Sequence, residues 1–255
     1  MTMKIGIGSY TFPWNVQRGM TADEILDAGI DFKVDVVQLC DNVDLSNLDW
    51  VGLCERATSA GIQIQVGGIG GPKEAIAMAT AAEKVGSPIV RFVIGPAFAT
   101  QSVPEIADDF RDVAKFCADH GSRLALENHD FFLTSQLAAI IEAIGNGCGA
   151  VLDTANSLSN LEGLESVVKN LGPHALCLHA KDVVAEREIH MYGFRIFGVQ
   201  SGNGGIDFAY LRDNLPFNET VILEQWTPKV NNETPLSQEK ATVASGLAHL
   251  RGIWQ

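Results

Sequence analysis

The chain has 255 residues, of which 46% are hydrophobic, so it can bury a large core within one α/β domain. Its 18 basic and 31 acidic side chains give a formal net charge of −13, which opposes binding to nucleic acid or to anionic membranes. No apolar run is long enough for a membrane span, and five scattered cysteines form no C-x-x-C motif. These features predict a soluble cytoplasmic protein with a small-molecule substrate and leave a homo-oligomer open.

The first half of the chain alternates short apolar segments with helical patterns. Strands are predicted at Lys4–Gly8, Asp35–Cys40, Ile62–Val66 and Pro88–Gly95. A capping box at Thr21 starts a helix that should end near Gly29, and further helices are expected over Leu48–Ala60 and from Pro72 to about Val85. The glycines that follow Val66 suggest a loose turn.

The second half repeats this alternation. Strands are predicted at the starts of Arg123–His129, Ala150–Asn156, Ala175–Asp182 and Val221–Trp226. Helices are predicted from Ser102 to Gly121, Thr134 to Gly145, Gly163 to Asn170, Asp207 to Asn214 and Ser237 to Leu250. The connection Val183–Gly205 is unusually long, so part of it is expected to cover a pocket with Arg187, His190, Tyr192 and Arg195.

Eight strand–helix pairs with continuous apolar strands favour a parallel sheet that is buried on both faces. A doubly wound open sheet is the alternative, but the turn after the first strand, GSYTFPW, contains no G-x-G-x-x-G motif. No linker or low-complexity segment divides the chain. The sequence therefore predicts residues 1–255 as one (β/α)8 TIM barrel.

Four of the predicted strands end in a side chain that can bind a metal. These residues are Glu127, Asp153, His179 and Glu224. In a parallel barrel the carboxyl ends of the strands meet, and so would these side chains. Each alone could be an ordinary hydrogen-bonded polar residue, but burying four unpaired polar groups together would be costly. One divalent ion is expected there, with Mn²⁺ favoured by the oxygen-rich set and Mg²⁺, Co²⁺ or Zn²⁺ as alternatives.

The motifs at these strand ends resemble the xylose-isomerase-like barrels. They are ENH at Glu127, LDT-x-N at Asp153, H-x-KD at His179, G-x-G-x-ID at Gly202 and the final LE at Glu224. That superfamily includes sugar isomerases, ketose 3-epimerases, sugar-acid lyases and decarboxylases, and abasic-site endonucleases. The resemblance implies that the four residues bind one divalent metal, and that Glu127 and Glu224 move protons on opposite faces of a bound sugar.

The chain departs from two branches of this superfamily. Where the epimerases have a histidine, an arginine and a second glutamate, this chain has Asn156, Ala185 and Leu133, which puts ordinary ketohexose binding in doubt. The endonuclease branch requires extra histidines for three zinc ions, one of them at the position of Asn156, and a D-x-H pair that is absent here.

Other residues near the strand ends are candidates for substrate contacts. Lys181 and His129 could act as further catalytic groups, against alternatives of an ion pair and a plain hydrogen bond. Substrate binding is predicted for Gln38, Asn42, Asn156, Trp14 and Trp226, with loop hydrogen bonding or core packing as the alternatives. Arg91, a charge in an apolar strand, is expected to form a structural ion pair.

The leading hypothesis is a metal-dependent sugar isomerase or epimerase that passes through an enediolate, with a glutamate as the general base. Loss of CO₂ from a 3-oxo sugar acid would use the same residues, so a decarboxylase is the first alternative. A non-catalytic sugar-binding barrel is the second, and the intact ligand set argues against it.

Overall fold

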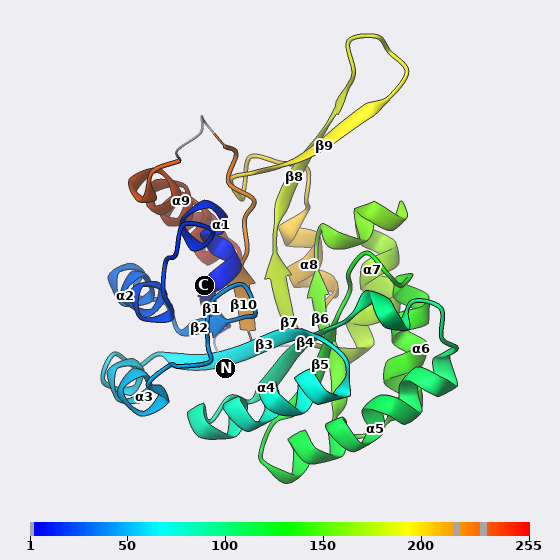
Figure 1. The fold of residues 1–255 in the computed structure, drawn as a ribbon. Coiled ribbons are helices and arrows are strands. Elements are labelled where there is room, and N and C mark those ends of the chain that lie inside the picture. The colour runs from blue at the N-terminus through cyan, green and yellow to red at the C-terminus, as the bar shows by residue number, and fades with distance from the viewer. Residues whose placement is uncertain (1–2, 217–219, 230–233) are drawn as a thin grey trace.

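The computed structural model describes residues 3–216, 220–229 and 234–255. Eight parallel strands form a closed barrel in the order β1-β10-β7-β6-β5-β4-β3-β2 (Figure 1). These strands are β1 (Lys4–Gly8), β2 (Val36–Leu39), β3 (Gln63–Gly70), β4 (Ile89–Ile94), β5 (Arg123–Glu127), β6 (Cys148–Asp153), β7 (Ala175–Ala180) and β10 (Thr220–Leu223). The predicted (β/α)8 barrel is confirmed.

Helices surround the barrel (Figure 1). They are α1 (Pro13–Val16), α2 (Ala22–Phe32), α3 (Trp50–Ser59), α4 (Pro72–Val85), α5 (Val103–Asp119), α6 (Thr134–Ile144), α7 (Leu164–Leu171), α8 (Phe208–Asn214) and α9 (Leu236–Trp254). Short 3-10 turns lie at Ser9–Thr11, Pro96–Phe98, Asn156–Asn160 and Gly172–His174. Among the described residues, none of the helices combines the length and apolar character that crossing a bilayer requires.

Local sequence signals set most helix boundaries. The Thr21 side chain accepts a hydrogen bond from the Glu24 backbone, and the Glu24 carboxylate accepts one from the Thr21 backbone, as the capping box predicts. The predicted end at Gly29 is wrong, because α2 continues to Phe32 and ends on Lys33, whose φ is 53°. A Cβ on Gly29 would lie 2.5 Å from the Val37 side chain, so this glycine permits close helix–strand packing.

One prediction about an irregular segment is wrong, and a second segment has structure that the sequence did not indicate. The glycines after Val66 do not form a loose turn, because β3 continues to Gly70 and pairs with β4 through Gly67↔Arg91 and Gly70↔Ile94. The long connection after β7 contains an antiparallel ribbon of β8 (Asp182–Arg187) and β9 (Phe194–Val199). This ribbon, called the arm below, projects away from the barrel (Figure 1).

The barrel interior changes in character along its axis. One end is filled by a small apolar cluster of Val36, Ile89, Ala125, Val151, Leu176, Cys177 and Ile222. Two neutral polar side chains are buried beside it, and the Gln38 amide donates to Gln65 Oε1 at 3.0 Å. Because inward-facing residues alternate along each strand, the next inward positions are Arg91, Glu127, Asp153, His179 and Glu224. The interior thus becomes charged at the carboxyl ends of the strands.

Candidate metal centre

The four predicted ligands come together at the carboxyl ends of neighbouring strands. Glu127 ends β5, Asp153 ends β6, His179 lies in β7, and Glu224 follows β10 directly. The register pairs Asp153 with His179, and all four side chains are buried. One donor atom from each lies within 4.8 Å of the others. His179 Nδ1 is 3.3 Å from Oε2 of both Glu127 and Glu224, so the imidazole sits between two carboxylates from opposite sides of the cluster.

Two buried cations partly balance the three carboxylates. Lys181 Nζ lies 2.5 Å from Asp153 Oδ2 and 3.2 Å from Glu224 Oε2. The Arg91 guanidinium pairs with Glu127 and lies 3.5 Å from Asp41 Oδ1. This pairing confirms the predicted ion pair of Arg91. A Cβ on Gly67 would lie 2.8 Å from Arg91 Cδ, so the glycine in β3 leaves the room that the arginine occupies.

These charges perturb one another strongly. Burial alone would raise the pKa of Glu127 and Glu224, but Arg91 and His179 hold the pKa of Glu127 well below its usual range. His179 and Lys181 likewise lower the pKa of Glu224 to about 2. Burial would lower the pKa of His179, and the two glutamates outweigh it and raise that pKa well above its usual value. The cluster therefore keeps two carboxylates ionised by surrounding them with positive charge.

Burial also raises the pKa of Asp153, and Lys181 only partly offsets it. Asp153 Oδ1 accepts from the backbone N–H groups of Ala155 and Asn156, both at 2.8 Å. Asn128 fixes the same strand end, accepting from the Asp153 backbone at 2.7 Å and donating to its carbonyl at 2.9 Å. The Asp153 carboxylate is therefore held in one orientation, with Oδ2 toward Lys181.

The donor set fits a divalent cation. Among the described residues, both His179 nitrogens and Glu224 Oε1 are buried without a hydrogen-bond partner. Buried polar atoms are normally satisfied, so several unpartnered ones that converge within a few ångströms suit the ligands of a cation. Both Glu127 oxygens already have partners, because Arg91 holds Oε2 and the Asn156 amide donates to Oε1 at 3.0 Å. Glu224 Oε1 is therefore the least engaged carboxylate oxygen, and Gly8 leaves space beside it.

A small cavity of about 130 Å³ opens onto this cluster. Four of the predicted site residues line it besides Glu224, namely Lys181, Asn156, His129 and Trp226. Lys181 Nζ lies 5.4 Å from the centre of the Trp226 ring. His129 contacts Asp130 at 3.4 Å, and its Nδ1 has no hydrogen-bond partner among the described residues.

Three residues predicted to bind substrate lie elsewhere in the structure. The Gln38 side chain is one layer deeper in the barrel, bonded to Gln65. Asn42 Oδ1 accepts from Ser9 Oγ at 2.5 Å, and Trp14 Nε1 donates to the Thr227 carbonyl at 2.8 Å. None of the three lines the cavity.

The cavity also contains residues that the sequence did not single out as site residues. Tyr10 and Asp41 line it, and the Tyr10 hydroxyl donates to Asp41 Oδ2 at 3.1 Å. Burial and the nearby Asp41 carboxylate raise the pKa of Tyr10, so the phenol keeps its proton. Both residues lie two positions beyond a strand end, Tyr10 after β1 and Asp41 after β2, and that position is the signal that could have found them.

The predicted cover over the pocket is not seen. Arg187, His190, Tyr192 and Arg195 are exposed on the arm, and none lines the cavity. Gly202 and Gly204, which follow the arm, donate backbone hydrogen bonds within the protein. Asp182 is buried and accepts backbone hydrogen bonds from Gly202 and Gly204, both at 2.9 Å, and from Ile206 at 3.1 Å. These donors are aimed at an internal carboxylate, which leaves them unavailable for a phosphate group.

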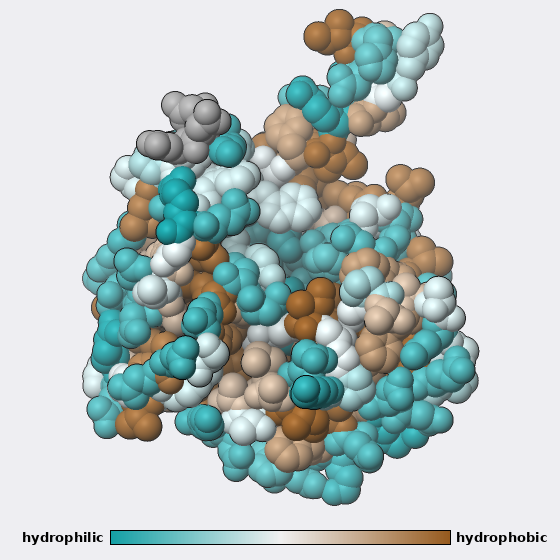
Figure 2. Space-filling model, in the orientation of Figure 1, coloured by the Kyte–Doolittle hydropathy of each residue, from teal (hydrophilic) through white to brown (hydrophobic). Residues whose placement is uncertain are grey.

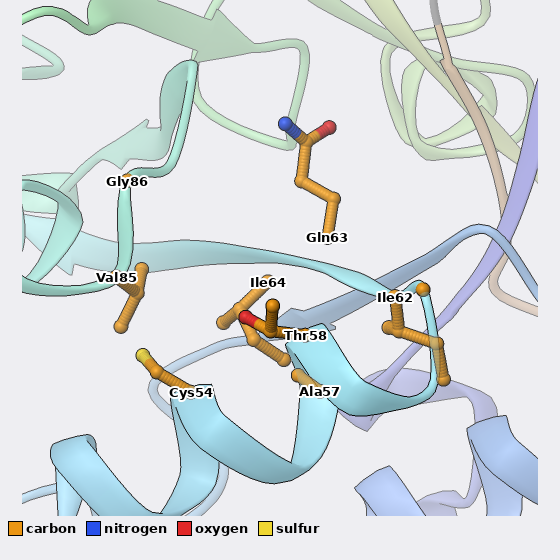
Figure 3. Close-up of a pocket in the computed structure, with 9 residues that line it drawn as sticks. Cys54, Ala57, Thr58, Ile62, Gln63, Ile64, Val85 and Gly86 are labelled. Carbon is orange, nitrogen blue, oxygen red and sulfur yellow. The ribbon is translucent and has the colours of Figure 1, made fainter.

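A larger cavity lies at the opposite end of the barrel. It measures about 350 Å³ and is bounded by α3, by the amino end of β3 and by the last residues of α4. Figure 3 shows Cys54, Ala57 and Thr58 of α3 facing Ile64 and Val85. Its lining contains no charged side chain.

Several proteins of known structure have a similar fold. No curated protein matches the chain by sequence. A xylose isomerase domain protein from Planctomyces limnophilus is 18% identical, with 99% of this chain and 96% of that chain covered and a TM-score of 0.72. A zinc-bound structure of the IOLI protein is 16% identical, with 98% of this chain and 96% of that chain covered and a TM-score of 0.72. An L-ribulose 3-epimerase is 17% identical, with 98% of this chain and 96% of that chain covered and a TM-score of 0.71.

At these identities the structural similarity shows the fold alone. The sequence model of one family, described as xylose isomerase-like TIM barrel, matches residues 73–253. That match spans well over half of the chain and includes all four residues of the buried cluster. The chain belongs to the xylose isomerase-like TIM barrel family.

Proposed function

We propose that this protein is a divalent-metal-dependent enzyme that isomerises or epimerises a small sugar or keto-sugar. The observation that carries the proposal is the cluster of Glu127, Asp153, His179 and Glu224, whose donor atoms lie within 4.8 Å of one another beneath a small cavity. A cavity of about 130 Å³ suits a small molecule. The similarity in fold to an L-ribulose 3-epimerase supports the choice of a sugar.

The four clustered residues would hold the metal. Three carboxylates and one imidazole suit Mn²⁺ or Mg²⁺, and the zinc named for the IOLI protein keeps Zn²⁺ among the candidates. When bound, such an ion supplies Lewis acidity toward adjacent oxygens of a polyhydroxy ketone. The remaining chemistry belongs to the side chains.

The two glutamates would move the protons. Glu224 has two carboxylate oxygens, so one can hold the metal while the other takes a proton from the carbon beside the ketone. Glu127 lies across the cluster, on β5, with β6 and β7 between it and β10. A proton returned from Glu127 would reach the opposite face of the enediolate, whereas a proton returned from Glu224 would reach the same face.

Cavity residues would orient the substrate. The Lys181 ammonium donates to Asn156 Oδ1 at 3.1 Å, and both side chains line the cavity, where the ammonium would meet substrate hydroxyl or carbonyl oxygens and Asn156 would hold the ammonium in place. Trp226 and Tyr10 provide aromatic surface on the cavity wall, and His129 Nδ1 is a further group that can bond to substrate. These contacts would exclude water from the reacting carbons.

A second candidate is decarboxylation of a 3-oxo sugar acid. The cavity is lined by two cations, Arg91 and Lys181, which would favour an anionic substrate. The carbon–carboxylate bond would break with its electron pair passing to the ketone, and a protonated group of the cavity such as Lys181 would then protonate the carbanion and regain its proton from water. A non-catalytic sugar-binding barrel remains the third candidate.

One experiment distinguishes the three. Protein loaded with Mg²⁺, which broadens proton spectra less than Mn²⁺, is incubated in D₂O with a panel of ketoses and 3-oxo sugar acids and followed by proton NMR. Deuterium at a sugar carbon without carbon loss is expected for isomerisation or epimerisation. Release of CO₂ would instead establish the decarboxylase, and binding without turnover would contradict both enzymatic proposals.

A further inference from the structure

The arm carries a concentration of exposed hydrophobic side chains. Between its strands and its tip it presents Ile189, Met191, Tyr192, Phe194 and Ile196, with exposed fractions from 46% for Ile196 to 98% for Ile189. Figure 2 shows hydrophobic residues at the outer end of this projection. A two-stranded ribbon is marginally stable by itself, and large side chains exposed on it have little to pack against within the chain.

The pairing of β8 with β9 determines which arm side chains share a face of the ribbon. Cross-strand partners share a face, so Phe194 and Ile196 lie on one face with Arg187 and Ala185. Glu186 and Arg195 form a pair on the other face, 3.1 Å apart. The face with the Glu186–Arg195 pair also carries Val184 and Phe197, so Phe194 and Ile196 are the exposed large apolar side chains of the first face.

The tip is also strained. Met191 has φ of 69°, a left-handed conformation that Gly or Asn adopts more easily at a turn, and its side chain is largely exposed. A solvent-exposed turn gains nothing from a methionine in that conformation. A methionine that contacts a partner does gain apolar contact there.

The extent of the apolar surface matches a specific interface. At about 200 Å² for a fully exposed large side chain, the five residues offer about 700 Å² per copy. Two copies that use the same surface would bury about 1,400 Å², within the range of about 1,200–2,000 Å² for specific complexes.

Charge favours a second copy as the partner. The chain as a whole carries −13, so two copies repel over most of their surfaces. The exposed arm is different, because Glu186 and Glu188 are matched by Arg187 and Arg195. Apart from the buried Asp182, the charges of the arm sum to zero, and the arm extends the contact away from the acidic body of the protein.

We propose that the face of the arm with Phe194 and Ile196, together with its tip, forms the interface of a symmetric dimer of this chain. The same surface serves both copies, as a two-fold axis requires. The strands hold Phe194 and Ile196 in register, and the tip adds Ile189, Met191 and Tyr192. This interface is independent of the metal centre and of the reaction proposed above.

The test is sedimentation velocity of the full-length protein between about 1 and 100 μM. The parent is expected to sediment as a dimer of twice the 27.4 kDa chain mass. The triple variant Ile189→Ser, Tyr192→Ser, Phe194→Ser should sediment as a monomer, with the dissociation constant raised at least about 100-fold because aromatic anchors dominate such interfaces. Val51→Ser is the matched control, since Val51 is an exposed apolar residue on α3, and it should leave the dimer intact.

A second variant avoids dependence on the folding of the triple variant. Joining Glu186 to Arg195, which are cross-strand partners, through Asn-Gly shortens the ribbon and removes its tip. Circular dichroism should show the barrel folded, and sedimentation should show a monomer. A parent that stays monomeric at about 100 μM, whether its arm is free or closed over its own cavity, would overturn the proposal. A folded shortened variant that still dimerises would overturn it as well.

Discussion

The two cavities at opposite ends of the barrel differ in the charge of their linings, and the smaller cavity is the charged one. The cavity at the amino end of β3, between α3 and the end of α4, is larger, about 350 Å³, and its lining contains no charged side chain. The cavity at the carboxyl ends is about 130 Å³ and lies against three carboxylates, two cations and an imidazole. Burying these charged groups together costs folding free energy, because each loses its hydration, so their presence indicates a functional role. Charge and unsatisfied donor atoms therefore locate the site better than volume does.

If the cavity at the carboxyl ends is the functional one, the largest expected effect is a loss of turnover when its glutamates are replaced. Glu224→Gln and Glu127→Gln keep an oxygen that can coordinate a metal but lose the basicity needed for proton transfer. Each variant, saturated with metal, is expected to turn over at least about 100-fold more slowly. The control is Glu55→Gln, the same change at an exposed position on α3, which should leave the rate unchanged. Normal turnover in both site variants at full metal occupancy would transfer the role of base to Lys181 or His129.

A second prediction compares two arginines that each contact two acids. Arg91 is buried between Glu127 and Asp41, so Arg91→Met leaves a buried carboxylate without its partner and should lower the free energy of unfolding by about 3–5 kcal/mol. Arg56 pairs with Asp23 and Asp27 at the surface, and Arg56→Met should cost about 0–1 kcal/mol. Urea denaturation of the metal-free proteins measures both. Equal losses would contradict the contrast between the charged interior and the surface.

The smallest effect is expected from chemical modification of the amino-end cavity. Cys54 lines that cavity and is partly exposed, so a thiol reagent should label it in the folded protein. Cys40 lies inside the barrel, and burial raises the pKa of its thiol to about 12, so it should remain unlabelled until the protein unfolds. Labelling followed by mass spectrometry identifies the residue. If modification of Cys54 abolished turnover, the amino-end cavity would have to be part of the functional site.

The cluster of Glu127, Asp153, His179 and Glu224 could be predicted because, in a parallel barrel, position along each strand is enough to tell which side chains meet. Inward-facing positions alternate along a strand, and function collects at the carboxyl ends, so four polar residues that end apolar strands must meet. The same rule extends two positions beyond His179 to Lys181, which the structure places against Asp153 and Glu224. It does not give depth along the barrel axis, and Gln38 therefore lies one layer below the cavity.

Other features depended on contacts that no local pattern encodes. The glycines in β3 favour a turn by propensity, but pairing with β4 and the room required by Arg91 keep them in a strand. Trp14 follows the same loop as Tyr10, yet its indole is fixed to the Thr227 carbonyl instead of reaching the cavity. In the arm only Phe194–Ile196 alternates apolar and charged residues, and the turn lacks the Asn-Gly signal that would have identified a hairpin.

The central claim is that the buried cluster is a metal site. The most direct measurement titrates the metal-free protein with Mn²⁺ while electron paramagnetic resonance follows the free ion. One ion per chain should bind, and Asp153→Asn should weaken binding at least about 10-fold in a folded barrel because it removes a charged ligand. Asp130→Asn, a change at an exposed carboxylate near the cavity, should bind as the parent does. Absence of binding in the parent, or equal affinity in Asp153→Asn, would contradict the claim.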